Sequence, residues 1–426
     1  MHWKKKKLPD HSLSLMAKRG VNKKSRSGLP PPPRKRRAIA AAAATTISEL
    51  PDDVIFDILL RIKSVIRCNR VCKRWRKLIL QPRFAKSHSS RWSLPLSLIF
   101  YRPSDCPATN PALFSILELD DDDDDDLARL GRQNATVTFR SEIYIPHNDY
   151  KGRVIGACNG LVCLRLDNDV VVCNPIVQAR RLFVLPKPPK LANSWSSFGF
   201  GFSPLSDEYK VLRCNETQGG HVNDIIISFE VCTLGRDDTW RSIGGGGGGG
   251  HYRIPFPRRS TSPGIDFVFV NGALYWLGED MASRLLYYFD VENEELGSTP
   301  SLPSQIEGIV HLEVLEGFLY LFDVHRESNV NVWVMREYKR TGAWTWILVC
   351  KLPYPRGIAG PIQPIKIFKD GTVLMILNKL IADQEKYGNV LASQNPQTGL
   401  IKYHEALLWT ESIAHAPSFL CPPWLL

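Results

Sequence analysis

Recurring hairpin-turn signals constrain the fold of this chain more than any other feature of its sequence. Four turn pairs lie between short apolar segments: Asn159-Gly160, Asn271-Gly272, Glu316-Gly317 and Asp370-Gly371. Asn-Gly and Asp-Gly favour the positive φ angles that two-residue hairpins need, so these pairs predict adjacent antiparallel strands. Helical periodicity is absent after about residue 92. This part of the chain is therefore expected to be all-β and built from many short strands.

A second pattern shows that these strands repeat as a unit. Polar turn residues follow five apolar runs at steps of 59, 57, 47 and 58 residues: Asn174, Thr233, Asp290, Glu337 and Asn395. A repeat of this length, with about four strands in each unit, is typical of kelch-type propeller blades. Residues 92–148 supply one more unit. The sequence thus predicts a kelch-like β-propeller of about six blades.

Residues 47–91 have a helical pattern instead, with apolar side chains three and four positions apart. Pro51 suits the first turn of a helix, and Asp52 and Asp53 follow it at the positive end of the helix dipole. The first stripe comprises Leu50, Val54, Ile55, Ile58, Leu59 and Ile62, and a second helical stretch carries Val65, Ile66, Val71, Cys72, Trp75, Leu78 and Ile79. So short a unit cannot bury both stripes alone. Part of this surface is expected to meet another protein or domain.

The net charge of +11 is concentrated near the amino terminus. Residues 1–46 hold 13 basic residues and one acidic residue, residues 47–91 hold 11 and 4, and the remainder carries −8. The first 46 residues show no apolar period, so a disordered basic tail is expected. Its cluster Arg34, Lys35, Arg36 and Arg37 is a candidate nuclear localisation signal. The protein is therefore expected in the nucleus, in the cytoplasm, or in both. Nucleic acid is not expected to bind the mildly acidic body.

No sequence pattern indicates catalysis, a metal or a cofactor. The acidic stretch 118–126 and the glycine run 244–250 are expected to be loops, since a uniform acidic run lacks preorganised ligand geometry and no Lys-Ser/Thr follows the glycines. The ten cysteines include no Cys-x-x-Cys pair and are expected to be reduced and to pack mainly in the core. Catalytic motifs such as H-E-x-x-H and G-x-S-x-G do not occur. With no run of about 18 apolar residues, a membrane is not an expected partner.

Two groups of residues together resemble a known family. Ile47-Ser-Glu-Leu-Pro-Asp-Asp-Val-Ile-Phe-Asp-Ile-Leu and Val71-Cys-Lys-Arg-Trp-Arg-Lys-Leu-Ile resemble an F-box. Six phrases resemble the F-box-associated domain of plant F-box proteins: Ala157-Cys-Asn-Gly-Leu-Val-Cys, Val172-Cys-Asn-Pro, Gly199-Phe-Gly-Phe-Ser-Pro, Asp207-Glu-Tyr-Lys-Val, Phe269-Val-Asn-Gly-Ala-Leu-Tyr-Trp and Val332-Trp-Val-Met-Arg-Glu-Tyr. They occur in the family's order and cover about residues 47–410. The resemblance implies an α+β multidomain chain: a tail over 1–46, a small helical F-box over 47–91 and an all-β propeller over 92–426.

The resemblance also implies a function. In this family the F-box docks on a small acidic Skp-type adaptor, and through it on cullin, while the second domain selects a protein target for ubiquitination. The implied adaptor-binding residues are Leu50, Pro51, Ile58, Leu59, Val71, Cys72 and Trp75. Such a receptor performs no bond-making itself. No target-binding residue is assigned, because loops carry no transferable code. Trp195, Trp344 and Trp346 are candidates to line a pocket, but packing within blades is the favoured role.

One departure from the family pattern leaves an alternative open. Arg61-Ile62 runs directly into Lys63-Ser64, where the family usually has about two more residues. The shortened turn favours a second hypothesis, in which the chain is a propeller scaffold with a degenerate F-box. A third hypothesis is that the basic tail makes a salt-sensitive contact with nucleic acid. An intrinsic enzyme is not expected.

Overall fold

A computed structural model describes most of the chain between residues 49 and 425. The described residues are 49–62, 65, 68–69, 71–91, 97–102, 112–118, 139–143 and 152–425, except for gaps at 167–168, 178–181, 190–193, 219–224, 244–264, 279–284, 299–301, 303–305, 307–308, 326–328, 336–345, 356–357, 382–385, 408–410, 416–417 and 420–421. The predicted nuclear signal at 34–37, the aspartates at 120–126 and the glycine run at 244–250 lie outside them.

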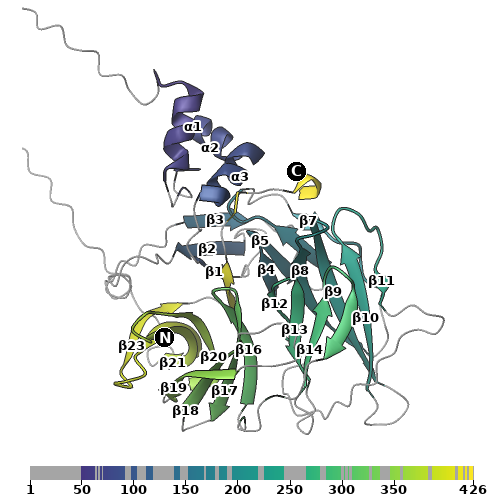
Figure 1. The fold of residues 1–426 in the computed structure, drawn as a ribbon, viewed down its shortest axis with the longest axis vertical. Helices are drawn as coiled ribbons and strands as arrows, with labels where there is room; N and C mark the ends of the chain where they lie inside the picture. The colour runs from purple at the N-terminus through teal and green to yellow at the C-terminus, as the bar shows by residue number, and fades with distance from the viewer. Residues whose placement is uncertain are drawn as a thin grey trace, which may run out of the picture. The chain divides into compact units, whose positions relative to one another are not determined.

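Three α-helices occupy the region with the helical sequence pattern: α1 (Asp52–Leu60), α2 (Lys73–Ile79) and α3 (Pro82–Arg91) (Figure 1). The sequence pattern predicted that the second helix starts near Val65. This start is wrong. Cys72 has extended backbone and its Sγ accepts a hydrogen bond from the Trp75 N–H at 3.4 Å, so the helix begins only after it. Among the described residues, no helix has the length and apolar character needed to cross a membrane.

The rest of the described chain forms six four-stranded sheets with antiparallel neighbours. In spatial order, sheet 1 is β24 (Glu411–His415), β1 (Ser97–Arg102), β2 (Ala112–Glu118) and β3 (Phe139–Ile143). Sheet 2 is β4 (Arg153–Cys158), β5 (Leu161–Leu166), β6 (Asp169–Cys173) and β7 (Phe183–Val184). Sheet 3 is β11 (Arg241–Ser242), β10 (Ile225–Thr233), β9 (Glu208–Gln218) and β8 (Ser194–Ser203). 

The other three sheets follow the same order along the chain. Sheet 4 is β12 (Val268–Val270), β13 (Ala273–Leu277), β14 (Leu286–Asp290) and β15 (Glu295–Ser298); sheet 5 is β16 (Ile309–Leu315), β17 (Phe318–His325), β18 (Asn329–Met335) and β19 (Trp346–Pro353); sheet 6 is β20 (Ile358–Ile367), β21 (Val373–Ile381), β22 (Lys386–Gln394) and β23 (Ile401–Leu407). A short 3-10 helix, η3 (Pro423–Leu425), follows them. The prediction of helices followed by an all-β propeller is confirmed, and the six described sheets agree with about six blades.

Sheet 1 joins two distant parts of the chain. Its strand β24 comes from the carboxy-terminal end and pairs with β1, with Ser97 opposite His415. Residues 92–148 therefore supply three strands of a sheet whose fourth strand lies about 300 residues later. This pairing joins both ends of the β region in one sheet.

The predicted hairpin turns connect the first and second strands of four sheets. Asn159-Gly160, Asn271-Gly272 and Glu316-Gly317 have positive φ at both residues, between 48° and 83°. This is the type I′ geometry expected for two-residue hairpins. The Asp370-Gly371 turn differs: only Gly371 has positive φ, and a longer loop is closed by the bond from the Phe368 N–H to the Thr372 carbonyl.

The repeating polar residues stand at the end of the third strand of their sheets. The side chains of Asn174, Asp290 and Asn395 each accept hydrogen bonds from N–H groups two and three residues later, at 2.9–3.2 Å. Such Asx turns replace backbone bonds that the chain gives up where it leaves a strand. At Thr233 the bond is reversed, and its N–H donates to Asp237. Glu337 lies outside the described residues.

Apolar clusters fill the space within and between neighbouring sheets. Trp276 is fully buried and its ring packs against those of Phe229 and Phe267. Among the described residues, five cysteines are buried in the sheets, at positions 158, 163, 173, 214 and 232, and burial raises the pKa of each thiol. Trp195 breaks the expected pattern: it is 43% exposed on β8, so the prediction that it packs inside a blade is wrong.

Candidate functional site

Helix α1 presents two different apolar sides. Ile55 and Leu59 are four residues apart and almost fully buried, so they hold the helix to its neighbours. Val54 and Ile58 have the same spacing on another side and are 42% and 40% exposed. Leaving such side chains in water forgoes the free energy that burying them would gain. This side of α1 is therefore available to a partner.

The segment that leads into α2 adds to this surface. Val71 is 61% exposed and Cys72 is exposed, while Trp75 is half-buried. A hydrogen-bonded ion pair from Arg74 Nε to Asp52 Oδ1, at 2.6 Å, joins the start of α2 to the start of α1. We call Val54, Ile58 and Val71 the exposed apolar set of the helices.

The structure separates the residues that the sequence assigned to adaptor binding. Pro51, Ile58, Val71 and Cys72 are exposed, and Leu50 and Trp75 are partly exposed. Leu59 has no exposed surface, so it belongs to the core of the helical unit and cannot touch a partner directly. Sequence reasoning also passed over Val54, although its spacing of four from Ile58 placed both on one side of the helix.

Exposed basic side chains lie on the same helical unit as the exposed apolar set. The exposed basic residues of the second and third helices are Lys73, Arg76, Lys77, Arg83, Lys86 and Arg91. Of the acidic residues in the first turn of α1, Asp52 binds Arg74, while the exposed Asp53 lies 4.0 Å from Arg83. The surface that remains is suited to an acidic partner, because complementary charge accelerates encounter.

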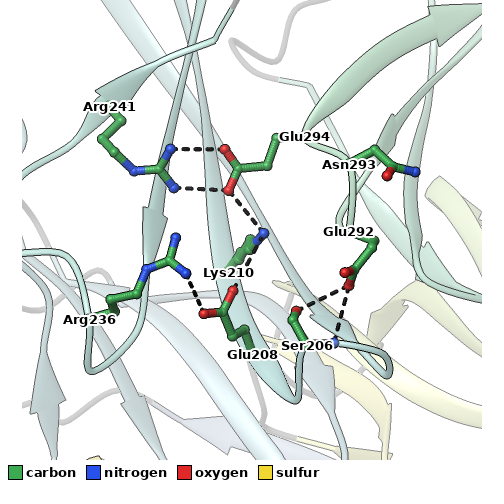
Figure 2. A pocket seen from close by; sticks show the side chains of 8 residues that line it. All are labelled: Ser206, Glu208, Lys210, Arg236, Arg241, Glu292, Asn293 and Glu294. Carbon is green, nitrogen blue, oxygen red and sulfur yellow. Dashed lines mark hydrogen bonds and ion pairs between the residues drawn. The ribbon is translucent and has the colours of Figure 1, made fainter.

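A second candidate site is a polar cavity of about 370 Å³ between sheets 3 and 4. Figure 2 shows its eight lining residues: Ser206, Glu208, Lys210, Arg236, Arg241, Glu292, Asn293 and Glu294. They come from β9, from β11, and from the turns β8–β9, β10–β11 and β14–β15. We call these residues, with Asp237, the polar cluster.

Glu294 is the centre of the polar cluster. Its carboxylate accepts two hydrogen bonds from Arg241, each 2.9 Å, and lies 2.9 Å from the Nζ of Lys210. Bonds from Arg241, followed by the effect of Lys210, hold the pKa of Glu294 below its usual value although burial opposes them. The same bonds raise the pKa of the Arg241 guanidinium. Only 5% of the Lys210 side chain is exposed, so this pairing compensates a nearly buried charge.

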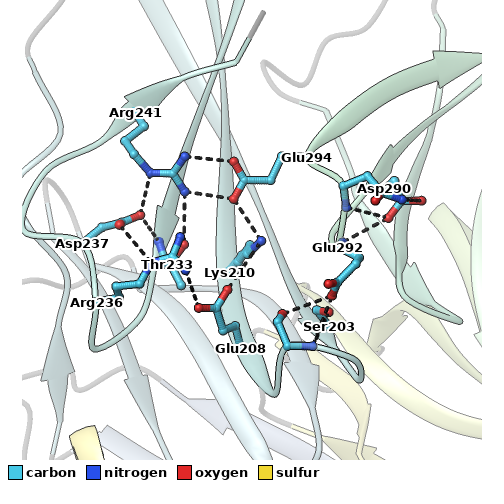
Figure 3. A network of polar contacts seen from close by, with 12 residues as sticks. Ser203, Glu208, Lys210, Thr233, Arg236, Asp237, Arg241, Asp290, Glu292 and Glu294 are labelled. Carbon is cyan, nitrogen blue, oxygen red and sulfur yellow. Dashed lines mark hydrogen bonds and ion pairs between the residues drawn. The ribbon is translucent and has the colours of Figure 1, made fainter.

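The remaining charges of the polar cluster are paired too (Figure 3). Arg236 binds Glu208 at 2.5 Å, and Arg241 also donates to Asp237 at 2.9 Å. Glu292 accepts bonds from the N–H and the hydroxyl of Ser206, at 3.3 and 3.1 Å. Since Ser206, Lys210 and Arg241 belong to sheet 3 and the two glutamates to sheet 4, the cluster clamps two sheets together.

This arrangement offers little chemistry. Its bases are bound to guanidinium, ammonium or hydroxyl groups, and general-base catalysis needs a group free to accept a proton. Across the residues that the structure describes, no group of three or more His, Cys, Asp or Glu side chains is placed to hold a metal ion. The sequence flagged the turn at Asp290 but not this cluster, because contacts between sheets leave no local signal.

Comparisons with known proteins agree with the geometry of the helices and sheets. Residues 47–90 match the F-box-like family, and residues 127–395, more than half of the chain, match the F-box associated beta propeller domain. An F-box protein of Arabidopsis thaliana is 27% identical over 411 residues, covering 87% of this chain and 91% of the relative. An F-box/kelch-repeat protein of the same plant is 24% identical over 337 residues, covering 77% and 85%.

Solved structures give a weaker likeness. A six-bladed fungal lectin from Aleuria aurantia is 8% identical with a TM-score of 0.34, covering 74% of this chain and 97% of the lectin. A luciferin-regenerating enzyme is 10% identical with a TM-score of 0.36, covering 69% and 91%. Similarity at this level supports no conclusion about ligand or activity. The family matches decide the assignment: the chain belongs to the F-box proteins that carry an F-box-associated β-propeller domain.

Proposed function

We propose that this chain is the substrate-recognition subunit of an SCF-type (Skp-cullin-F-box) ubiquitin ligase. Its helices bind a Skp-type adaptor and, through it, a cullin, and its propeller recruits a protein target. The observation that carries the proposal is the exposed apolar set, Val54, Ile58 and Val71, in the part of the chain that matches the F-box. Apolar side chains left exposed on so small a unit are typical of an interface.

Charge supports the same partner. The exposed basic residues of α2 and α3 belong to the same helical unit as the apolar set, and an acidic adaptor would be drawn to them before apolar contact forms. The ion pair between Arg74 and Asp52 keeps α1 and α2 together, so Val71 and Ile58 are presented by one unit. We place Val54, Ile58, Val71, Pro51 and Cys72 in the adaptor surface.

The proposed role requires no catalytic residue in this chain. A receptor that binds target and adaptor at once raises the effective concentration of target lysines near a ubiquitin carrier held by other subunits. The paired charges of the polar cluster fit this role, since they hold two sheets together.

Co-isolation tests this proposal. The full chain is expressed with a Skp-type adaptor and a cullin, beside the variant Ile58→Asp/Val71→Asp and the control Leu205→Asp, which changes an 86% exposed leucine of the propeller. We expect the wild type and the control to retain adaptor and cullin, and the double variant to lose both. Absence of both partners from the wild type would contradict the proposal and favour the scaffold with a degenerate F-box.

We also propose that the basic cluster Arg34 to Arg37 directs part of the protein to the nucleus. An exposed basic tetrapeptide suits an acidic receptor groove. Replacing all four residues with alanine is expected to shift a fluorescent fusion toward the cytoplasm. An unchanged nuclear fraction would contradict this proposal and leave the ligase proposal intact.

A further inference from the structure

Residues near the carboxy-terminal end contact both the helices and the sheets. The Ser418 carbonyl accepts a hydrogen bond of 2.9 Å from the side-chain amide of Asn174, which is fully buried in the turn after β6. The same Asn174 side chain accepts the N–H groups of Ile176 and Val177. One amide therefore holds its own turn and the carboxy-terminal segment together.

The next residue reaches the third helix. The buried ring of Phe419 meets the rings of Phe84 and His88 on α3 edge-on, each with a centroid distance of 6.2 Å. His88 is itself buried, and its Nε2 lies 2.9 Å from the Ile62 carbonyl just after α1. Phe419 thus packs on a histidine that ties two parts of the helical unit together.

A third contact completes the link between helices and sheets. The side-chain amide of Asn69, which is buried ahead of α2, donates a hydrogen bond of 3.2 Å to the Ile176 carbonyl. Ile176 lies in the turn that Asn174 organises. The helices therefore hold the turn after β6 directly through Asn69 and indirectly through Phe419 and Ser418.

The far end of the segment is anchored in sheets 2 and 3. Trp424 packs edge-on against Phe183, at 4.9 Å between centroids, and against Tyr209, at 5.7 Å. Leu425 is buried in the apolar cluster of the same sheets. Close approach requires glycine here: a Cβ on Gly235 would lie 2.6 Å from the Trp424 Cβ, and one on Gly160 would lie 2.3 Å from the Ser418 Cβ.

We propose that residues 418–419 and 422–425 act as a brace that fixes the F-box helices in one orientation relative to the propeller. Phe419 is its contact with the helices, and Trp424 and Leu425 are its anchor in the sheets. The consequence rests on the proposed function: with the brace in place, adaptor and target are held at a constant separation. A constant separation raises the effective concentration of target lysines more than a flexible joint does.

The test measures orientation in the full chain without any adaptor. Spin labels on non-natural residues at the exposed positions Asp57 of α1 and Leu205 of the propeller report the distance between them. We expect one narrow distance distribution in the wild type and a clearly broadened one in Phe419→Ala. Phe318→Ala, which removes a partly exposed ring of sheet 5, is the matched control and is expected to stay narrow.

Each outcome decides the proposal. A distribution that is already broad in the wild type, or as narrow in Phe419→Ala as in the wild type, would overturn the brace. Where Phe419→Ala loses helical circular dichroism, Trp424→Ala, which removes the anchor of the brace in sheets 2 and 3, replaces it as the deciding variant, with the same criteria. No adaptor is present in this measurement. The width of the distance distribution therefore tests the brace whether or not the chain binds an adaptor.

A second readout links the brace to ubiquitin transfer. With adaptor and cullin present, Phe419→Ala is expected to keep adaptor affinity within about twofold of the wild type and to slow ubiquitination of a bound target by about tenfold or more, as expected when a fixed geometry is lost. A broadened distribution with an unchanged transfer rate would confirm the brace and contradict its functional consequence.

Discussion

The exposed apolar set of the helices and the polar cluster between sheets 3 and 4 are opposite kinds of surface. The helices leave Val54, Ile58 and Val71 in water, whereas the polar cluster pairs a nearly buried Lys210 and the charges around it within the chain. The first surface gains free energy only when a partner covers it. The second gains nothing from a partner and is already complete. Solvent exposure of apolar groups, rather than density of charge, is therefore the basis on which we propose the partner surface.

The largest effect is expected at Leu59, which can be compared with its exposed neighbour Ile58 on the same helix. Leu59→Ala is expected to destabilise the helical unit by about 4 kcal/mol, since it leaves a cavity in a buried site. Hydrogen exchange of the amides of α1 and α3 measures the loss. Unchanged protection would show that Leu59 is not a core residue and would return it to the adaptor surface.

Glu294→Gln tests whether the polar cluster stabilises the fold. Removing the charge leaves Lys210 with only Glu208, at 3.7 Å, and weakens the bidentate pair with Arg241, so we expect a loss of about 2–3 kcal/mol in the free energy of unfolding. Denaturant titration of the propeller signal measures it. A loss below about 0.5 kcal/mol would show that the cluster contributes little to stability and does not hold sheets 3 and 4 together.

The same substitution has a pH signature. Glu294 has a lowered pKa in the folded chain, so its contribution to stability is present above its unfolded pKa of about 4.5 and is lost as the pH falls through the folded value. The stability difference between the wild type and Glu294→Gln is therefore expected to be full at pH 6–7 and to shrink in acid below about pH 4.5. A difference independent of pH would mean that the carboxylate charge is not its source.

Two equivalent turns allow a finer test of the clamp. Glu294 lies four positions after the Asx-turn residue Asp290, and Gly399 lies four positions after the Asx-turn residue Asn395. Both have positive φ, 54° at Glu294 and 68° at Gly399. Glycine adopts this conformation freely, whereas a glutamate is strained there by about 1 kcal/mol. Because we expect the ion pairs of Glu294 to outweigh this backbone strain, Glu294→Gly should lower the free energy of unfolding. A stabilised Glu294→Gly variant would show that strain dominates.

The smallest expected effect completes the contrast. Ile58→Ala is expected to change the free energy of unfolding of the isolated chain by less than about 0.5 kcal/mol, because Ile58 is 40% exposed and its truncation leaves no enclosed cavity. Thermal unfolding beside Leu59→Ala measures the difference between adjacent residues. A large loss for Ile58→Ala would place it in the core and remove it from the partner surface.

Local chemistry made much of the fold predictable from the sequence. Asn159-Gly160 and Asn271-Gly272 encode their turns through φ preferences of the residues themselves, and Asn174 encodes its Asx turn in the same way. The pairing of β24 with β1 was not predictable, because no local pattern relates strands so far apart in the chain. The start of α2 was missed since a cysteine cap at Cys72 carries no strong signal.

The candidate site was predictable only in part. Helical spacing placed Ile58 and Val71 among the apolar residues but could not tell which side of α1 faces solvent, so it did not distinguish the buried Leu59 from the exposed Val54. That choice is made by packing against α2 and α3, which depends on the folded chain. The polar cluster was missed for a related reason, since Arg241 and Glu294 meet only when sheets 3 and 4 are neighbours.

Equilibrium binding of the full chain to a purified Skp-type adaptor tests the central claim most directly. The account predicts tight binding by the wild type and by Leu205→Asp, and a loss of at least about 100-fold, or roughly 2.7 kcal/mol, in Val71→Asp, because a charge replaces an apolar contact. The variant is first shown to keep its helical and β circular dichroism. Equal affinity of wild type and Val71→Asp, or no binding by the wild type at micromolar concentrations, would contradict the account.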